Sequence, residues 1–201
     1  MTNVFPNLID LNAIAALPHK QFEGKIIVAD NLTSVHGAIK MAENYPILGF
    51  DTETKPSFKK GKTNIVCMIQ LSGPDVAFIF RLNKIGFPDE LARLLSSNNI
   101  TKIGLSLKDD FRELSKLRLI KPSSFVELQS YVEQFAIQEK GLKKLAALIL
   151  GIRISKSQQT SNWESEVLSS SQLAYAATDA WVCLEIYNKL KEVELQFSKG
   201  A

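Results

Sequence analysis

Residues 47–54 read ILGFDTET, an apolar run that ends in two carboxylates. The run follows a break at Tyr45-Pro46 and predicts a buried β-strand over Ile47–Thr52. Side chains alternate between the faces of a strand, so Asp51 and Glu53 point the same way, about 6–7 Å apart along the chain. Like charges placed together destabilise each other unless a cation lies between them. The alternative is a solvated strand end with two exposed acids.

A second pair of acids begins a helix predicted over residues 108–117. Residues four apart share a helix face, so Asp109 aligns with Glu113 on a polar side, whereas Asp110 aligns with Leu114 on the inward side. We therefore expect Asp110 to lean toward the sheet and Asp109 to face water. The alternative is that both acids only favour the helix dipole.

The third signal is the stretch 173–187, LAYAATDAWVCLEIY, whose charged residues are Asp179 and Glu185. A helix that is apolar nearly all round is buried, and a buried ionised carboxylate is costly unless it is paired or binds a metal. Tyr175 lies four residues before Asp179 and shares its face. The alternative is Asp179 paired with an arginine elsewhere, beside a core tyrosine.

Asp51, Glu53, Asp110 and Asp179 thus come from three separate elements and are all hard oxygen ligands. Such ligands select Mg²⁺ or Mn²⁺ over zinc, and the two histidines, His19 and His36, both lie near the start of the chain. Two divalent ions roughly 3.5–4 Å apart are suited to in-line phosphoryl chemistry.

The rest of the chain alternates short strands and helices. Strands are predicted at 25–29, 64–71, 75–82 and 102–105, with a further candidate at 124–128, and helices at 31–44, 88–97, 140–150 and 172–195. The short connection Ser72-Gly73-Pro74 makes its two strands an antiparallel hairpin. This order predicts an α/β fold, a mixed five-stranded sheet flanked by helices. Residues 1–24 are expected to form an N-terminal arm that packs on a single domain, 25–201.

Composition excludes several classes of protein. The 201 residues include 24 Lys and Arg against 21 Asp and Glu, and 45% are hydrophobic, which rules out disordered, collagen-like and coiled-coil chains. Cys67 and Cys183 are expected to be buried thiols, without a disulfide framework or a zinc site. The first ten residues lack a signal-peptide pattern and no apolar run could span a membrane, so a cytoplasmic or otherwise intracellular location without membrane contact is expected.

Over about residues 25–195, the chain resembles the DEDD superfamily of 3′–5′ exonucleases, in its ribonuclease D and Werner-type branch. The matching residues are Asp51 and Glu53 in GFDTET, Asp110 in IGLSLKDDFREL, and Tyr175 and Asp179 in YAATD. Tyr175 implies the tyrosine (DEDDy) subtype, because the histidine of the other subtype would replace Ala174. Lys156, Gln159 and Ser161-Asn162-Trp163-Glu164 are similar to a loop of Werner-type relatives.

The resemblance implies a ribonuclease H-like fold and a metal-dependent enzyme that releases nucleoside 5′-monophosphates from nucleic-acid 3′ ends. It implies that Asp51, Glu53 and Asp179 hold one Mg²⁺ or Mn²⁺ ion, which activates a water. It also implies that Asp51 and Asp110 hold a second ion, which stabilises the leaving 3′ oxygen. Tyr175 would orient the water, because an ordinary tyrosine pKa of about 10 makes it a poor base.

Thr54 and the loop that follows the first motif are candidate substrate contacts. Residues 55–62 read KPSFKKGK, so Lys59 and Lys60 could steer a phosphate backbone and Phe58 could lie near a base. Trp163 is a further candidate. The alternatives are a solvated lysine-rich loop and a tryptophan that anchors its own loop.

The partner is thus expected to be a nucleic-acid 3′ end. The SNWE loop at 161–164 favours DNA over RNA. An exoribonuclease that trims RNA 3′ ends, as ribonuclease D does, is the alternative. A non-catalytic nucleic-acid-binding module is a further alternative, although all five motif residues are present.

Overall fold

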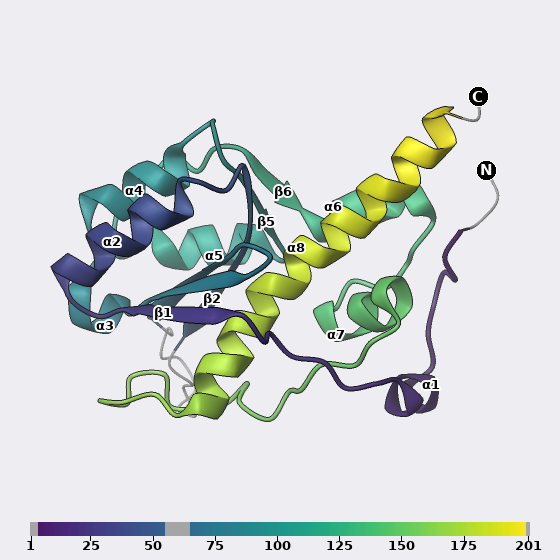
Figure 1. Ribbon diagram of the computed structural model, residues 1–201, viewed down its shortest axis with the longest axis horizontal. Helices are drawn as coiled ribbons and strands as arrows, with labels where there is room; N and C mark the ends of the chain where they lie inside the picture. Colours follow the sequence, from purple (N-terminus) through teal and green to yellow (C-terminus); the bar gives the residue numbers. More distant parts are fainter. Residues whose placement is uncertain (1–3, 55–64, 200–201) are drawn as a thin grey trace.

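The computed structural model describes residues 4–54 and 65–199, and at its centre is a six-stranded sheet in the order β1-β4-β3-β2-β5-β6 (Figure 1). The strands are β1 Lys25–Ala29, β2 Ile47–Thr54, β3 Val66–Ser72, β4 Val76–Phe80, β5 Thr101–Gly104 and β6 Phe125–Glu127. The β2–β3 and β3–β4 pairs are antiparallel, whereas β1–β4, β2–β5 and β5–β6 are parallel. The mixed sheet and the β3–β4 hairpin are therefore confirmed.

The predicted number of five strands is wrong, because the candidate at 124–128 forms a sixth. Strand β6 spans three residues and extends one edge by pairing parallel to β5. So short a strand has little periodicity of its own, and its pairing partner defines it.

Helices cover both faces of the sheet. The helical elements are α1 Leu11–Ala16, α2 Leu32–Ala42, α3 Leu82–Ile85, α4 Asp89–Ser96, α5 Leu107–Leu114, α6 Leu128–Tyr131, the 3₁₀ turn Val132–Phe135, α7 Leu142–Leu145, the π turn Ala146–Leu150, and α8 Ser170–Lys199. Helices α2, α4 and α5 share one apolar core with Leu48 and Phe50 of β2. Helix α8 crosses the opposite face diagonally and shares a second core with β5 and α7 (Figure 1). No helix in the described part of the chain is both long and apolar enough to cross a membrane.

The N-terminal segment packs on this framework and contains helix α1, which the sequence did not indicate. Phe5 is buried beside Phe135, with ring centroids 6.1 Å apart, and Phe22 is buried beside Trp181. The arm thus contacts the α7–α8 side of the domain at two separated points.

Gly49 in β2 lets helix α8 lie directly against the strand. A Cβ atom at Gly49 would lie 1.8 Å from the carbonyl oxygen of Ala180 and 3.3 Å from the Cβ of Leu184. No side chain therefore separates the two backbones at this point. Asp51 is two residues further along β2, and Asp179 immediately precedes Ala180 in α8, so this contact sets how closely the two acids approach.

Gly49→Ala should destabilise the domain by about 3 kcal/mol or more, because the added methyl meets helix backbone that cannot rotate away. Gly37 in α2 is the matched control, since nothing lies within 4 Å of the position of its Cβ. Gly37→Ala should be stabilising by up to about 1 kcal/mol through helix propensity. Chemical denaturation of both variants checks this, and equal stabilities would contradict it.

Candidate active site

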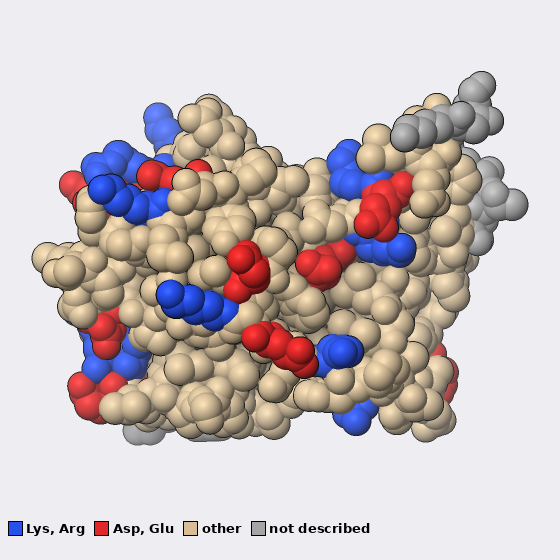
Figure 2. Space-filling view, in the orientation of Figure 1, with Lys and Arg blue, Asp and Glu red and all other residues tan. Residues whose placement is uncertain are grey.

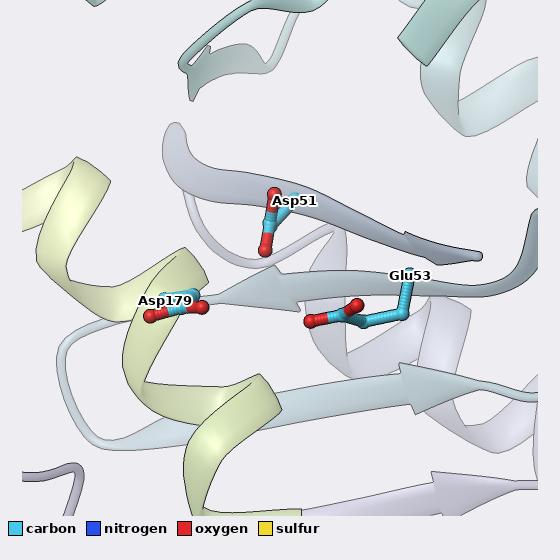
Figure 3. Close-up of side chains that lie close together, drawn as sticks. All are labelled: Asp51, Glu53 and Asp179. Atoms are coloured by element: carbon cyan, nitrogen blue, oxygen red, sulfur yellow. The ribbon is translucent and has the colours of Figure 1, made fainter. Parts of the chain in front are cut away.

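Three carboxylates converge where β2 and α8 meet. Asp51 and Glu53 project from β2 toward Asp179 of α8 (Figure 3), and each of the three offers an oxygen within 4.8 Å of the others. Strand alternation places Asp51 and Glu53 on the face that α8 covers. Asp179 is buried, with 8% of its surface exposed, and the two strand acids are half-buried. Three oxygen ligands at this spacing suit a hard divalent cation.

Asp110 reaches the same end of β2 from the other helical layer. Its Oδ1 accepts a 2.6 Å hydrogen bond from Oγ1 of Thr52, the residue between Asp51 and Glu53. Its neighbour Asp109 is exposed and forms an ion pair with Arg112 at 2.8 Å. Asp110 therefore faces the sheet and Asp109 faces water, as their helical spacing indicated.

Glu127 fixes the start of the helix that carries Asp110. Its carboxylate accepts hydrogen bonds from the backbone N–H groups of Leu107 at 2.7 Å and Ser106 at 3.1 Å. Ser106 has a left-handed backbone with φ of 63°, so the turn into α5 is a strained one that the carboxylate supports. The sequence did not single out Glu127, because it lies in the short edge strand β6.

Burial raises the pKa values of all four acids. For Asp51 burial is the largest cause and repulsion from Asp179 the next, and together they hold its pKa well above the usual range. Burial likewise raises the pKa of Glu53 to about 9 and that of Asp179 to about 7. For Asp110 it raises the pKa to about 6 against the opposing hydrogen bond from Thr52. The cluster therefore retains protons that a bound cation would displace.

Asp179 has no arginine partner among the residues that the structure describes. Its side chain hydrogen-bonds with Tyr175, and Lys156 contributes a favourable charge that lowers its pKa, although burial outweighs both. Burial and then Asp179 raise the pKa of the Tyr175 hydroxyl, so this hydroxyl stays protonated at neutral pH and acts as a hydrogen-bond donor. The alternative of an Asp179–arginine pair is thus not what the structure shows.

Trp163 anchors its loop. Its side chain is fully buried in a cluster with Met68 and Ile79, and its ring centroid lies 5.9 Å from that of Tyr175. An indole with no exposed surface favours the anchoring interpretation over direct substrate contact. Thr54 is half-buried at the end of β2, just after a register shift against β3. Phe58, Lys59 and Lys60 lie outside the described residues.

Gln70 is a buried polar residue that the sequence reasoning missed. It pairs directly with Asp51 across the β2–β3 ladder and therefore shares the face of the cluster. Its side chain is fully buried, and its amide nitrogen and oxygen have no hydrogen-bond partner among the described residues. The available signal was a polar residue in the otherwise apolar run 65–71, IVCMIQL. An unpaired buried amide is costly, so its place beside Asp51 adds to the polar character of the site.

Comparison with known proteins shows which family this chain belongs to. Residues 26–194 match the family model of the 3′-5′ exonuclease domain. The chain belongs to this 3′–5′ exonuclease family. The resemblance drawn from the three acidic motifs is thereby confirmed.

Two curated relatives illustrate the range of this exonuclease family. The bifunctional 3′-5′ exonuclease/ATP-dependent helicase WRN of Mus musculus is 33% identical over 184 residues, covering 87% of this chain and 13% of that protein. DNA polymerase I of Aquifex aeolicus is 30% identical over 166 residues, covering 81% of this chain and 27% of that protein. The exonuclease chain thus spans a minor part of the length of these relatives.

Solved structures share the fold of the exonuclease domain. The Nibbler EXO domain of Aedes aegypti has a TM-score of 0.77 at 24% identity, covering 86% of this chain and 91% of its own. Escherichia coli RNase D has a TM-score of 0.74 at 21% identity, covering 86% of this chain and 45% of its own. The predicted ribonuclease H-like fold is confirmed.

The raised pKa values predict how the stability of the metal-free domain depends on pH. The folded state holds protons that the unfolded chain, with carboxyl pKa values of about 4, has already released. Stability should therefore fall as the pH rises from about 4 through the folded-state pKa values, up to about 9 for Glu53. At pH 8 in a chelator, the side chain of Asp51→Asn is neutral without having to take up a proton, so this variant should raise the melting temperature by about 2–4 °C, which corresponds to roughly 1 kcal/mol.

Asp109→Asn is the control for this measurement, because Asp109 is exposed and lies outside the cluster. It should leave the melting temperature within about 1 °C of the wild type, as is usual for a surface substitution. Mn²⁺ should stabilise the wild type more than Asp51→Asn. A lower melting temperature for Asp51→Asn in chelator would show that the buried Asp51 carboxyl does not destabilise the metal-free fold.

Proposed function

We propose that this domain is a metal-dependent exonuclease that hydrolyses the last phosphodiester bond of a nucleic-acid 3′ end and releases nucleoside 5′-monophosphates. The observation that carries the proposal is the meeting of Asp51, Glu53 and Asp179 within 4.8 Å, in a chain of the 3′–5′ exonuclease family. Asp110, hydrogen-bonded to Thr52 at the same end of β2, supplies a fourth carboxylate.

We assign two Mg²⁺ or Mn²⁺ ions to these carboxylates. Asp51, Glu53 and Asp179 would hold one, and Asp51 together with Asp110 would hold the other. All these ligands are carboxylate oxygens, which Mg²⁺ and Mn²⁺ prefer over the nitrogen and sulfur ligands typical of zinc. Bound ions of this kind lower the pKa of water and neutralise charge that develops on phosphate oxygens.

Tyr175 would position the attacking water. Its hydroxyl is protonated, and its hydrogen bond with Asp179 fixes it beside the cluster. The buried indole of Trp163 packs on the tyrosine ring and limits its movement. A protonated hydroxyl with so high a pKa orients water and does not remove its proton.

DNA is the favoured substrate class. The two curated relatives with the identities given above are named as a helicase-linked exonuclease and a DNA polymerase. The second candidate is RNA 3′-end trimming, supported by the common fold with RNase D. Activity on matched DNA and RNA strands separates them.

Asp51→Ala should reduce mononucleotide release on the order of a thousandfold or more, because Asp51 would contact both ions. The measurement is a gel assay with Mg²⁺ or Mn²⁺ on 5′-labelled single strands, recessed duplexes and RNA. Asp109→Ala, at the exposed acid next to Asp110, is the control and should retain full activity. Unchanged activity in a folded Asp51→Ala protein would refute the assignment.

Tyr175→Phe should lower kcat by roughly tenfold to a hundredfold while Mn²⁺ binding is kept, since the carboxylates remain and only the orienting hydroxyl is lost. Steady-state kinetics and calorimetric titration with Mn²⁺ measure the two effects separately. If this variant no longer binds Mn²⁺, Tyr175 has a structural role in the site.

A further inference from the structure

We propose that residues 17–22 of the N-terminal arm form one wall of the substrate cleft and that Lys20 contacts the phosphate backbone of the strand whose 3′ end enters the site. The inference rests on the proposed exonuclease function and adds a binding element to it. The arm lies outside residues 26–194, which match the exonuclease family model.

One end of the wall is fixed to α8 beside the carboxylate cluster. The backbone N–H of Phe22 donates a 2.9 Å hydrogen bond to Oγ1 of Thr178, the residue immediately before Asp179. Oγ1 of Thr178 in turn donates to the carbonyl oxygen of Ala174 at 2.6 Å. Phe22 itself is buried, with its ring centroid 6.3 Å from that of Trp181. The arm is therefore held on the helix turn that presents Asp179.

The other end of the wall is fixed to the segment that follows the π turn. His19 forms a parallel bridge with Arg153. The backbone N–H of Lys20 donates to the carbonyl oxygen of Arg153 at 3.0 Å, and the N–H of Arg153 donates to Pro18 at 3.0 Å. The Arg153 side chain adds a 3.0 Å hydrogen bond from Nε to the carbonyl oxygen of Leu17. Residues between these two anchor points have a defined position relative to α8.

A cavity of about 140 Å³ lies between the arm and the candidate active site. It is lined by His19, Lys20 and Gln21 of the arm and by Tyr175, Thr178 and Asp179 of α8, with three serines completing it. All three arm side chains are exposed. The arm thus borders the same space as the residues proposed to bind the ion and to orient the water.

The charge of Lys20 suits a phosphate group. Its ammonium forms no ion pair with a carboxylate among the described residues, unlike that of Lys191, which pairs with Glu194 at 2.7 Å. On the face seen in Figure 2, basic side chains are scattered and several lie next to acidic ones, without a broad basic surface. A cluster of carboxylates repels a polyanion, so an unpaired cation at its border has a direct electrostatic role.

The experiment measures binding of a 5′-fluorescein-labelled 12-nucleotide single strand by anisotropy, with Asp51→Ala as the inactive background. Lys20→Ala should raise Kd about threefold to tenfold and reduce the slope of log K against log salt by about one, as expected for one lost phosphate contact. Lys20→Glu should weaken binding further, and Lys20→Arg should restore it. The Lys20→Ala substitution should raise Kd by the same factor for DNA and for RNA strands of matched sequence, because the contact is to phosphate.

Lys121→Ala is the matched control, since Lys121 is exposed on the α4–α5 side of the molecule. It should leave Kd and the salt slope unchanged. In the active protein, Lys20→Ala should raise KM and leave kcat unchanged, and its melting temperature should match the wild type. The inference would be overturned if Lys20→Ala had the same Kd as Lys121→Ala, or if it left the slope of log K against log salt unchanged.

The two proposals fail in distinguishable ways. If the wild type releases mononucleotides and Lys20→Ala binds strands as tightly as the control, the exonuclease function stands and the arm proposal is wrong. If the wild type has no metal-dependent activity but strand binding still depends on Lys20, the arm is supported as a binding surface and the exonuclease function is wrong.

Discussion

The direct contact between the backbones of β2 and α8 at Gly49 and Ala180 is the constraint on which the site depends. Helices and sheets ordinarily keep a layer of side chains between their backbones. Here the strand has no side chain at the crossing point, and a Cβ would overlap the carbonyl oxygen of Ala180. The acids on either side of the contact, Asp51 and Asp179, are thereby brought within ligand distance of a common point.

This arrangement opposes the stability of the metal-free fold. Asp51, Glu53 and Asp179 are gathered in a buried environment where each raises the cost of ionising the others. Gln70 adds, on the same face, an amide without a hydrogen-bond partner among the described residues. The two apolar cores on either side of the sheet compensate for these unfavourable groups. Buried titratable and polar groups that lower the stability of a fold are typical of functional sites.

Much of this could be predicted from the sequence because the relevant patterns are local. The alternation of ILGFDTET puts Asp51 and Glu53 on one face, and the apolar surroundings of Asp179 indicate its burial. Features that depend on distant partners could not be predicted. The capping of α5 by Glu127 joins residues 20 apart, and the bond from Phe22 to Thr178 joins residues 156 apart. No periodicity or spacing in the sequence indicates either of these two contacts.

Strand β2 is the element on which both helical layers converge at the site. Asp179 approaches it from the α8 layer, and Asp110 approaches it from the α5 layer through Thr52. The position of Asp110 relative to Asp51 is consequently set by a single β-strand and not by a flexible loop. A change within β2 would therefore displace the acids of both layers together, whereas a shift of α5 or of α8 alone would displace the acid of that layer only.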